Sequence, residues 1–268
     1  MKNQLTKLLS LLLCYWAFHL RITPVAAQSI TPAADGTGTI INHNGNTYNI
    51  DGGTQAGANL FHSFAEFGLT PDEIANFLSN PQIDNILGRV TGGNPSVIQG
   101  LIQLTEGNSN LYLMNPNGWV FGQEASLDVP GSFAATTATR IGFGEGFFNA
   151  YGENDFSNLA GNPTSFVFDT ETGLILNEGD LEVGEGQSLW LIGNSVISTG
   201  TLEAPGGNVT IAAVPGNKQI RLSQEGMVVE LVLDAAPLTA GEYPQQIGLR
   251  AVDIPRYLTG GNQVGHAK

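Results

Sequence analysis

Short stretches rich in apolar residues, separated by turns rich in glycine and asparagine, run through most of the chain. Residues 111–114 (Leu-Tyr-Leu-Met) and 119–121 (Trp-Val-Phe) are two such stretches, and each follows a cluster of glycine and asparagine. A strand places successive side chains on opposite faces, and Gly and Asn favour the turns that end strands. This pattern predicts an all-β protein.

One segment, residues 70–81, predicts a short helix instead. Thr70 suits the N-cap position, Pro71 suits the first helical position, and Glu73 completes a capping box. Apolar side chains at positions 74, 77 and 78 follow at helical spacing, and Asn-Pro at 80–81 ends the segment.

Three copies of one pattern indicate which all-β architecture is present. Each copy has a leucine, an outward-facing acid, a small or branched apolar residue and then a turn, and the copies occupy residues 126–131, 180–186 and 201–207. Leu202 follows Leu181 by 21 residues, which is about one coil of a parallel β-helix. The repeats favour a parallel β-helix, with a β-sandwich of unequal loops as the alternative.

The interval between the first two copies is longer than two coils. Leu127 and Leu181 are 54 residues apart, and the interval contains a glycine-rich aromatic segment at 141–148 and further aromatic residues up to Phe168. We interpret the interval as one ordinary coil plus an excursion whose aromatic side chains pack on the flank of the solenoid.

The first 27 residues have the three parts of a secretory signal peptide. Lys2 and Lys7 form the positive region, residues 8–20 are almost wholly apolar, and small residues precede a cleavage site between Ala27 and Gln28. The apolar run is too short to span a bilayer, and an amphipathic or buried N-terminal helix is the alternative interpretation. The pattern places the mature chain outside the cytoplasm.

Charge and cysteine content narrow the function classes. The chain has 10 basic and 24 acidic residues, for a net charge of −14, and cleavage after residue 27 would remove three bases and no acid. The mature chain then has a net charge of 7 − 24 = −17, which argues against a nucleic-acid partner because nucleic acids bind basic patches. The same cleavage removes Cys14, the single cysteine, so a disulfide framework and a cysteine-rich zinc site are excluded.

Familiar catalytic and metal-binding motifs are absent from the sequence. It has no H-E-x-x-H, G-x-S-x-G or phosphate-loop pattern, and His43, His62 and His266 are too far apart to indicate a metal site. His62 lies in an aromatic segment, where we expect a hydrogen-bonded histidine beside the core. We expect no cofactor and no metal.

Acidic residues are numerous enough to raise the possibility of a glycosidase or lyase. However, Asp128, Glu182 and Glu203 occupy equivalent positions of the repeats, which indicates a solvated outer face, whereas catalytic carboxylates converge in one groove. The negative net charge would also repel an anionic polymer. We therefore expect a protein that is not an enzyme, and a polysaccharide-active or carbohydrate-binding β-helix protein is the alternative.

Residues Asn115-Pro116-Asn117-Gly118 form the sharpest local motif. Proline restricts φ and Asn-Gly tolerates positive φ, so the motif predicts a tight turn between two strands. An asparagine amide in such a turn can also bridge to the backbone of the next coil.

Four further motifs accompany this turn between residues 28 and 215. They are Asp51-Gly52-Gly53-Thr54, then residues 59–64 (Asn-Leu-Phe-His-Ser-Phe), then Gly92-Gly93-Asn94-Pro95-Ser96, and after the turn Gly131-Ser132-Phe133. In this order the five motifs resemble the N-terminal domain of filamentous haemagglutinin-type exoproteins. The glycine- and asparagine-rich style is similar to the cyanobacterial branch.

The resemblance implies a right-handed parallel β-helix with an N-terminal cap and extra-helical strands, which we place at residues 28–225 together with the one short helix. Residues 226–268 would form a C-terminal β segment and a polar tail. Exoproteins of this family usually continue for many hundreds of residues. A chain that stops at Lys268 would therefore be a truncated exoprotein, a gene fragment or a stand-alone domain.

The resemblance also implies a function, the secretion signal of two-partner secretion. The periplasmic domains of an outer-membrane transporter would recognise the domain, the chain would cross as an extended polypeptide, and folding outside would pull the rest through. An adhesion-type role follows as an expectation, with host or cell-surface glycans as partners and a location at or beyond the cell surface.

The family's Asn-Pro-Asn-Gly motif is tied to secretion. A second family motif, Asn-Pro-Asn-Leu, has a partial counterpart at positions 94–97, and Trp119 stands where the family usually has Ile or Leu. The residues to which the resemblance transfers transporter recognition are Asn115, Pro116, Asn117, Gly118, Asn94 and Pro95.

Overall fold

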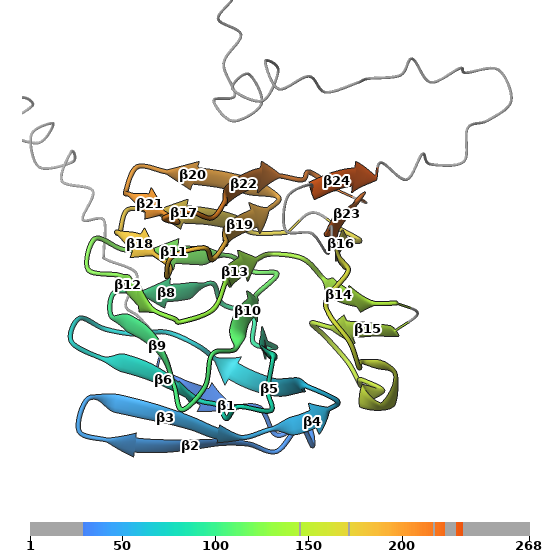
Figure 1. Cartoon of the computed structure of the whole chain (residues 1–268), viewed down its shortest axis with the longest axis horizontal. Helices are drawn as coiled ribbons and strands as arrows, with labels where there is room; N and C mark the ends of the chain where they lie inside the picture. Colours follow the sequence, from blue (N-terminus) through green and yellow to red (C-terminus); the bar gives the residue numbers. More distant parts are fainter. Residues whose placement is uncertain (1–28, 145, 171, 217, 223–228, 233–268) are drawn as a thin grey trace, which may run out of the picture.

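The computed structural model describes residues 29–144, 146–170, 172–216, 218–222 and 229–232. These residues form an all-β structure in which parallel strands wind into a solenoid (Figure 1). The expected signal peptide, with its cleavage site between Ala27 and Gln28, lies outside the described residues. So does most of the segment 226–268, of which only Val229–Val232 is described.

Three parallel ladders form the sides of the solenoid. Ladder A contains β5 (Asn59–Glu66), β7 (Asn85–Val90), β10 (Asn110–Met114), β13 (Phe133–Thr136), β19 (Leu189–Gly193) and β22 (Val209–Ala213). Ladder B contains β8 (Ser96–Ile98), β11 (Trp119–Phe121), β17 (Leu174–Asn177) and β20 (Ser195–Ser198). Ladder C contains β3 (Thr47–Gly52), β6 (Ile74–Leu78), β9 (Leu101–Thr105) and β12 (Ser126–Asp128), and β18 (Leu181–Glu182) with β21 (Leu202–Glu203) continues this side.

The second and third copies of the repeat are stacked in register. Leu181 pairs with Leu202 between β18 and β21, and Leu189 pairs with Val209 between β19 and β22. The inner row of ladder A runs through Ile86, Leu111 and Phe133, each fully buried. Equivalent apolar side chains therefore lie one above another, and the parallel β-helix predicted from the repeats is confirmed.

Antiparallel strands close the N-terminal end of the solenoid. The strands β1 (Thr31–Pro32) and β4 (Thr54–Ala56) pair with β5, and β2 (Thr39–Asn44) pairs with β3. This cap uses hydrogen-bonding groups that a bare edge strand would expose.

A five-stranded antiparallel sheet, here called the extra-helical sheet, covers the outer face of ladder A. It contains β14 (Arg140–Phe143), β15 (Gly146–Asn149), β16 (Ser165–Phe168), β23 (Lys218–Leu222) and β24 (Val229–Val232). Its buried aromatic rings, including Phe148 and Phe166, pack against outward side chains of ladder A such as Phe61, Tyr112 and Met114. The predicted aromatic excursion is therefore confirmed, and ladder A is buried on both of its faces except at its last strand, β22.

The helix predicted for residues 70–81 is wrong. The Glu73 carboxylate does accept a hydrogen bond from the Thr70 N–H at 2.7 Å, but Asp72 has a φ of +68°, which is incompatible with helix propagation. Ala75 and Phe77 are buried while their neighbours in β6 are half-buried, so the burial pattern has a period of two. The capping signal starts a turn here, and parallel pairing with β3 and β9 decides the element.

Arg89 connects the cap, the solenoid and the extra-helical sheet. The residue is 2% exposed, and its guanidinium forms an ion pair with Asp35, at 2.8 Å between Nη2 and Oδ2. Nε donates to the Ser63 hydroxyl at 3.0 Å, and Nη1 donates to the carbonyls of Asn149 and Gly152 at 2.7 and 2.9 Å. Burial raises the pKa of Asp35, but hydrogen bonds from Ser63, Thr37 and Arg89 outweigh burial and lower this pKa to about 2. The carboxylate therefore stays ionised opposite Arg89.

The substitution Arg89→Met should lower the free energy of unfolding by about 3–5 kcal/mol, because it leaves the Asp35 carboxylate without its cation. Urea denaturation followed by circular dichroism measures the loss. The matched control is Arg140→Met, which breaks the more exposed pair with Asp169 and should cost at most about 1 kcal/mol. Equal losses in the two variants would contradict a connecting role for Arg89.

Candidate functional site

The turn Asn115–Gly118 joins ladder A to ladder B, between β10 and β11. The Gly118 N–H donates to the Asn115 carbonyl at 3.0 Å, which closes the turn. The Asn115 side-chain oxygen accepts from the Asn117 N–H at 2.9 Å. The tight turn predicted from the motif is present.

The two asparagine amides of the turn bind the coil below. The Asn115 Nδ2 donates to the Asn94 carbonyl at 3.1 Å and to the Ser96 hydroxyl at 3.0 Å, and the Asn117 Nδ2 donates to the Gly92 carbonyl at 2.7 Å. The segment 92–96 is the corresponding corner of the preceding coil. The structure therefore places the Asn94-Pro95 pair against the Asn-Pro-Asn-Gly turn, as two stacked corners.

The coil that stacks above the turn also approaches it closely. The Gly173 N–H donates to the Pro116 carbonyl at 2.7 Å. A Cβ atom on Gly173 would lie 2.2 Å from the Asn117 carbonyl oxygen, and one on Gly118 would lie 2.7 Å from the Leu174 carbonyl oxygen. Glycine is thus required at these corners by the approach of neighbouring backbones.

Trp119 fills the core directly after the turn. Its side chain is fully buried, and its indole Nε1 donates to the Thr136 carbonyl at 3.0 Å. The Asn115 N–H donates to the same carbonyl, also at 3.0 Å. The larger side chain at position 119 is therefore accommodated without loss of the turn, because its polar atom has a partner.

The six candidate residues differ in how far they are exposed to solvent. Asn115, Pro116 and Gly118 are buried, and Asn117 is half-buried. Asn94 and Pro95 are exposed on the adjacent corner. In the folded domain, the side-chain amides of Asn115 and Asn117 are hydrogen-bonded to the preceding coil.

The first two motifs also meet in space, at the first rung of ladder A. Gly53 has a φ of +85°, and a Cβ atom there would lie 2.6 Å from the Phe61 carbonyl oxygen and 3.0 Å from the His62 ring. The expected hydrogen bonding of His62 is wrong. Its ring is fully buried, and neither ring nitrogen has a hydrogen-bond partner among the described residues.

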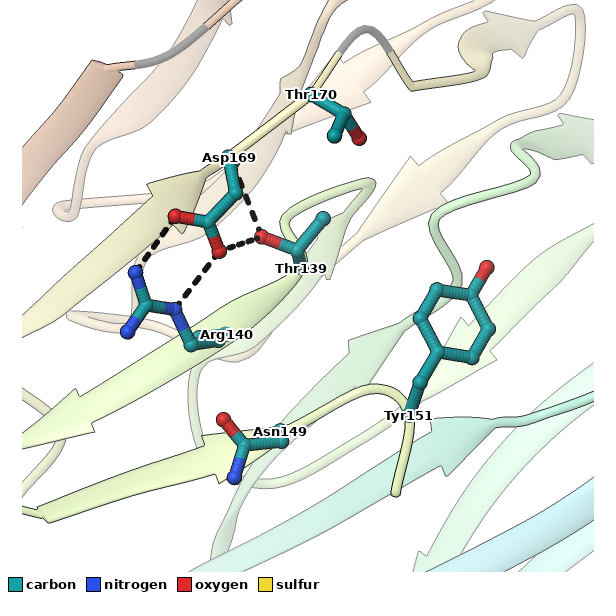
Figure 2. Close-up of a pocket in the computed structure, with 6 residues that line it drawn as sticks. All are labelled: Thr139, Arg140, Asn149, Tyr151, Asp169 and Thr170. Carbon is teal, nitrogen blue, oxygen red and sulfur yellow. Dashed lines mark hydrogen bonds and ion pairs between the residues drawn. The ribbon is translucent and has the colours of Figure 1, made fainter.

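Figure 2 shows a shallow pocket in the extra-helical sheet, and one of its residues, Tyr151, contacts the turn Asn115–Gly118. It has a volume of about 360 Å³ and is lined by Thr139, Arg140, Asn149, Tyr151, Asp169 and Thr170. Arg140 binds Asp169 through two bonds, at 2.6 and 2.8 Å, and the Asn117 amide lies 3.4 Å from the Tyr151 hydroxyl. Sequence reasoning missed this pocket because its residues come from three separated segments with no shared motif.

In the described structure the acidic residue of the pocket, Asp169, is ion-paired, and the acids of the repeats are exposed. Burial raises the pKa of Asp169, but hydrogen bonds from Arg140 and Thr139, with the charge of Arg140, produce a net lowering. Asp128, Glu182 and Glu203 are exposed on the outer face, as the repeat pattern predicted. Among the described residues, no group of three or more His, Cys, Asp or Glu side chains is placed to hold a metal ion, and no helix has the length and apolarity needed to cross a membrane.

Comparison with known proteins gives consistent matches. The family model described as the TPS secretion domain matches residues 27–235. The HMW1 secretion domain from Haemophilus influenzae aligns with a TM-score of 0.52 and 20% identity, covering 79% of this chain and 49% of that chain. The filamentous hemagglutinin secretion domain aligns with a TM-score of 0.52 and 17% identity, covering 81% of this chain and 72% of that chain. At these identities the two structures establish the fold.

A curated protein is also similar to part of the chain. The heme/hemopexin-binding protein of Haemophilus influenzae is 31% identical over 147 residues, which are 53% of this chain. The match spans 14% of that protein, so the chain corresponds to a small part of its length.

Two glycines, at the corners below and above the turn Asn115–Gly118, should respond differently to alanine. Gly173→Ala should lower the free energy of unfolding by about 1–3 kcal/mol, because the added Cβ collides with the Asn117 carbonyl. Gly93→Ala is the control, since a Cβ atom there meets nothing within 4 Å, and it should change stability by less than about 1 kcal/mol. Urea denaturation measures both, and an unaffected Gly173→Ala protein would contradict the close stacking of these corners.

Proposed function

The chain belongs to the family of TPS secretion domains, and we propose that its solenoid carries the signal by which an outer-membrane transporter of the two-partner type recognises and exports it. The observation that carries this proposal is the pair of stacked corners at 92–96 and 115–118. They bring together every residue to which the recognition role was assigned.

The burial of the motif indicates when recognition takes place. In the folded domain the Asn115 and Asn117 amides bind the preceding coil, and Asn115 is fully buried. A transporter that reads these amides therefore meets the chain before the solenoid closes. Once the coils stack, the same amides release the transporter and donate hydrogen bonds to the carbonyls of Asn94 and Gly92.

Folding after export supplies a direction for transport. Each described coil stacks on the one before it, beginning at the antiparallel cap, so the solenoid grows by nearest-neighbour contacts. Coils that close outside cannot slide back through the transporter, and the chain is drawn outward without a nucleotide. The mature protein would lie at the cell surface or in the medium, after removal of the signal peptide in the periplasm.

An adhesion-type role without catalysis completes the proposal, and carbohydrate binding is the second candidate function. The pocket of Figure 2 favours the second candidate, because Tyr151 is 49% exposed beside the Arg140–Asp169 pair and Thr170. An exposed aromatic ring next to planar polar groups suits the apolar face and hydroxyls of a sugar. Calorimetric titration with neutral and acidic oligosaccharides tests it: binding should occur and be lost in Tyr151→Ala, and no binding to the unaltered protein would contradict it.

The secretion role is tested with a pair of asparagines in matched environments. Asn177 is buried like Asn115, and its amide donates to the Gly179 carbonyl and the Ser198 hydroxyl, both at 3.1 Å. Alanine at either position should therefore cost a similar stability, about 1–3 kcal/mol, because each leaves buried acceptors without a donor. Urea denaturation of the two purified variants checks that they match.

Co-expression with the cognate transporter then separates recognition from folding. Asn115→Ala should reduce extracellular yield by about tenfold, equivalent to about 1.4 kcal/mol of lost recognition, while Asn177→Ala should stay within about twofold of the unaltered chain. Quantitative immunoblotting of the medium measures both. Equal losses would show that folding alone explains the effect, and export that is independent of the transporter would overturn the proposal.

A further inference from the structure

His62 is the one polar residue in an otherwise apolar inner row of ladder A. The row runs in register from His62 through Gly88, Leu113, Ala135 and Leu191. The imidazole is fully buried, and within the described part of the chain neither Nδ1 nor Nε2 has a hydrogen-bond partner. A buried polar group without a partner carries a free-energy cost, and a buried charge carries a much larger one.

The surroundings of the ring favour its neutral form. The Phe77 ring of β6 and the Phe64 ring of β5 lie 6.0 and 6.2 Å from it between centroids, and the backbone of Gly53 lies against its edge. Burial lowers the pKa of His62 to about 4, and the charge of Asp51, on β3, raises it only in part.

A further charged group near this row lies on the other side of the ladder. Arg89 of β7 is one position past Gly88, so its side chain points to the outer face, where it binds Asp35. Phe77 and Gly53, the contacts from β6 and from the turn after β3, bring no titratable group to the ring. The described environment therefore offers a proton on His62 no direct acceptor.

We propose that His62 is a proton-sensitive gate on the folding of this domain, so that the first coil closes against the cap only around a neutral imidazole. The position of His62 on β5 explains why its protonation would affect the whole domain. β5 is the first parallel rung of ladder A, and it pairs with the capping strands β1 and β4 on one side and with β7 on the other. Opening this rung removes the platform on which later coils stack. The gate is a property of the isolated chain and does not depend on the proposed export role.

The direction of the pH effect follows from proton linkage. The unfolded chain binds a proton on His62 near pH 6.5, whereas the folded chain binds it only near pH 4. The His62 component of stability is therefore fully present above about pH 7.5 and decreases as the pH falls through 6.5 toward 4. The stability that Asp35 contributes is fully present above its ordinary pKa of 3.8 and is lost only as the pH falls toward its folded value of about 2.

Urea unfolding of the purified chain at pH 7.5, 6.5, 5.8 and 5.0 tests the gate. Between pH 7.5 and 5.0 the ratio of unfolded to folded protein, extrapolated to zero urea, should rise about 25-fold from His62 alone. In His62→Leu this component should be absent. His43→Gln is the matched control, since His43 is exposed on β2, and it should retain the full rise.

A second measurement, on the unaltered protein, tests the proposal if His62→Leu does not fold. The NMR signals of the His62 ring, assigned through selective labelling, should remain those of a neutral imidazole down to pH 5.0 in the folded chain. Titration of this ring near pH 6.5 in the folded state, or an undiminished pH dependence in His62→Leu, would overturn the proposal.

Discussion

The stacking of one coil on the next is the constraint on which the whole structure depends. Within the ladders the backbone groups bind each other, but at every corner the chain turns and these groups need other partners. Side-chain amides supply some of these partners. The Asn59 amide donates to the carbonyls of Leu159 and Gly161. The Asn115 and Asn177 amides donate to the carbonyls of Asn94 and Gly179. The high asparagine and glycine content is a consequence of this geometry.

Burial of ladder A on both faces adds a second constraint. Its inner face forms the solenoid core, and its outer face packs under the aromatic side chains of the extra-helical sheet. Arg89 reaches from this ladder to both the cap and the extra-helical sheet, so the three parts of the domain share one buried cation. Closure of the solenoid, docking of the sheet and placement of the cap are therefore coupled.

Local patterns predicted the parts of the fold that depend on neighbouring residues. The 21-residue spacing of Leu181 and Leu202 became a direct pair, and Asn115–Gly118 became a turn. The helix at 70–81 failed because a capping signal is local while β6 is stabilised by strands on either side of it. The partnerless ring of His62 could not be foreseen either, since alternation does not say which face of a strand is more deeply buried.

The sequence by itself determined the all-β class, the coil length, the aromatic excursion and the position of the motif turn, because alternation and turn preference act over a few residues. Only the tertiary structure decided that the motif amides bind the preceding coil, that Arg89 joins three parts and that His62 lies inside the solenoid. Each of these depends on which coil lies above or below, and residues about 20–100 positions apart in sequence make those contacts. Stacking register, rather than local preference, assigns each polar side chain its partner.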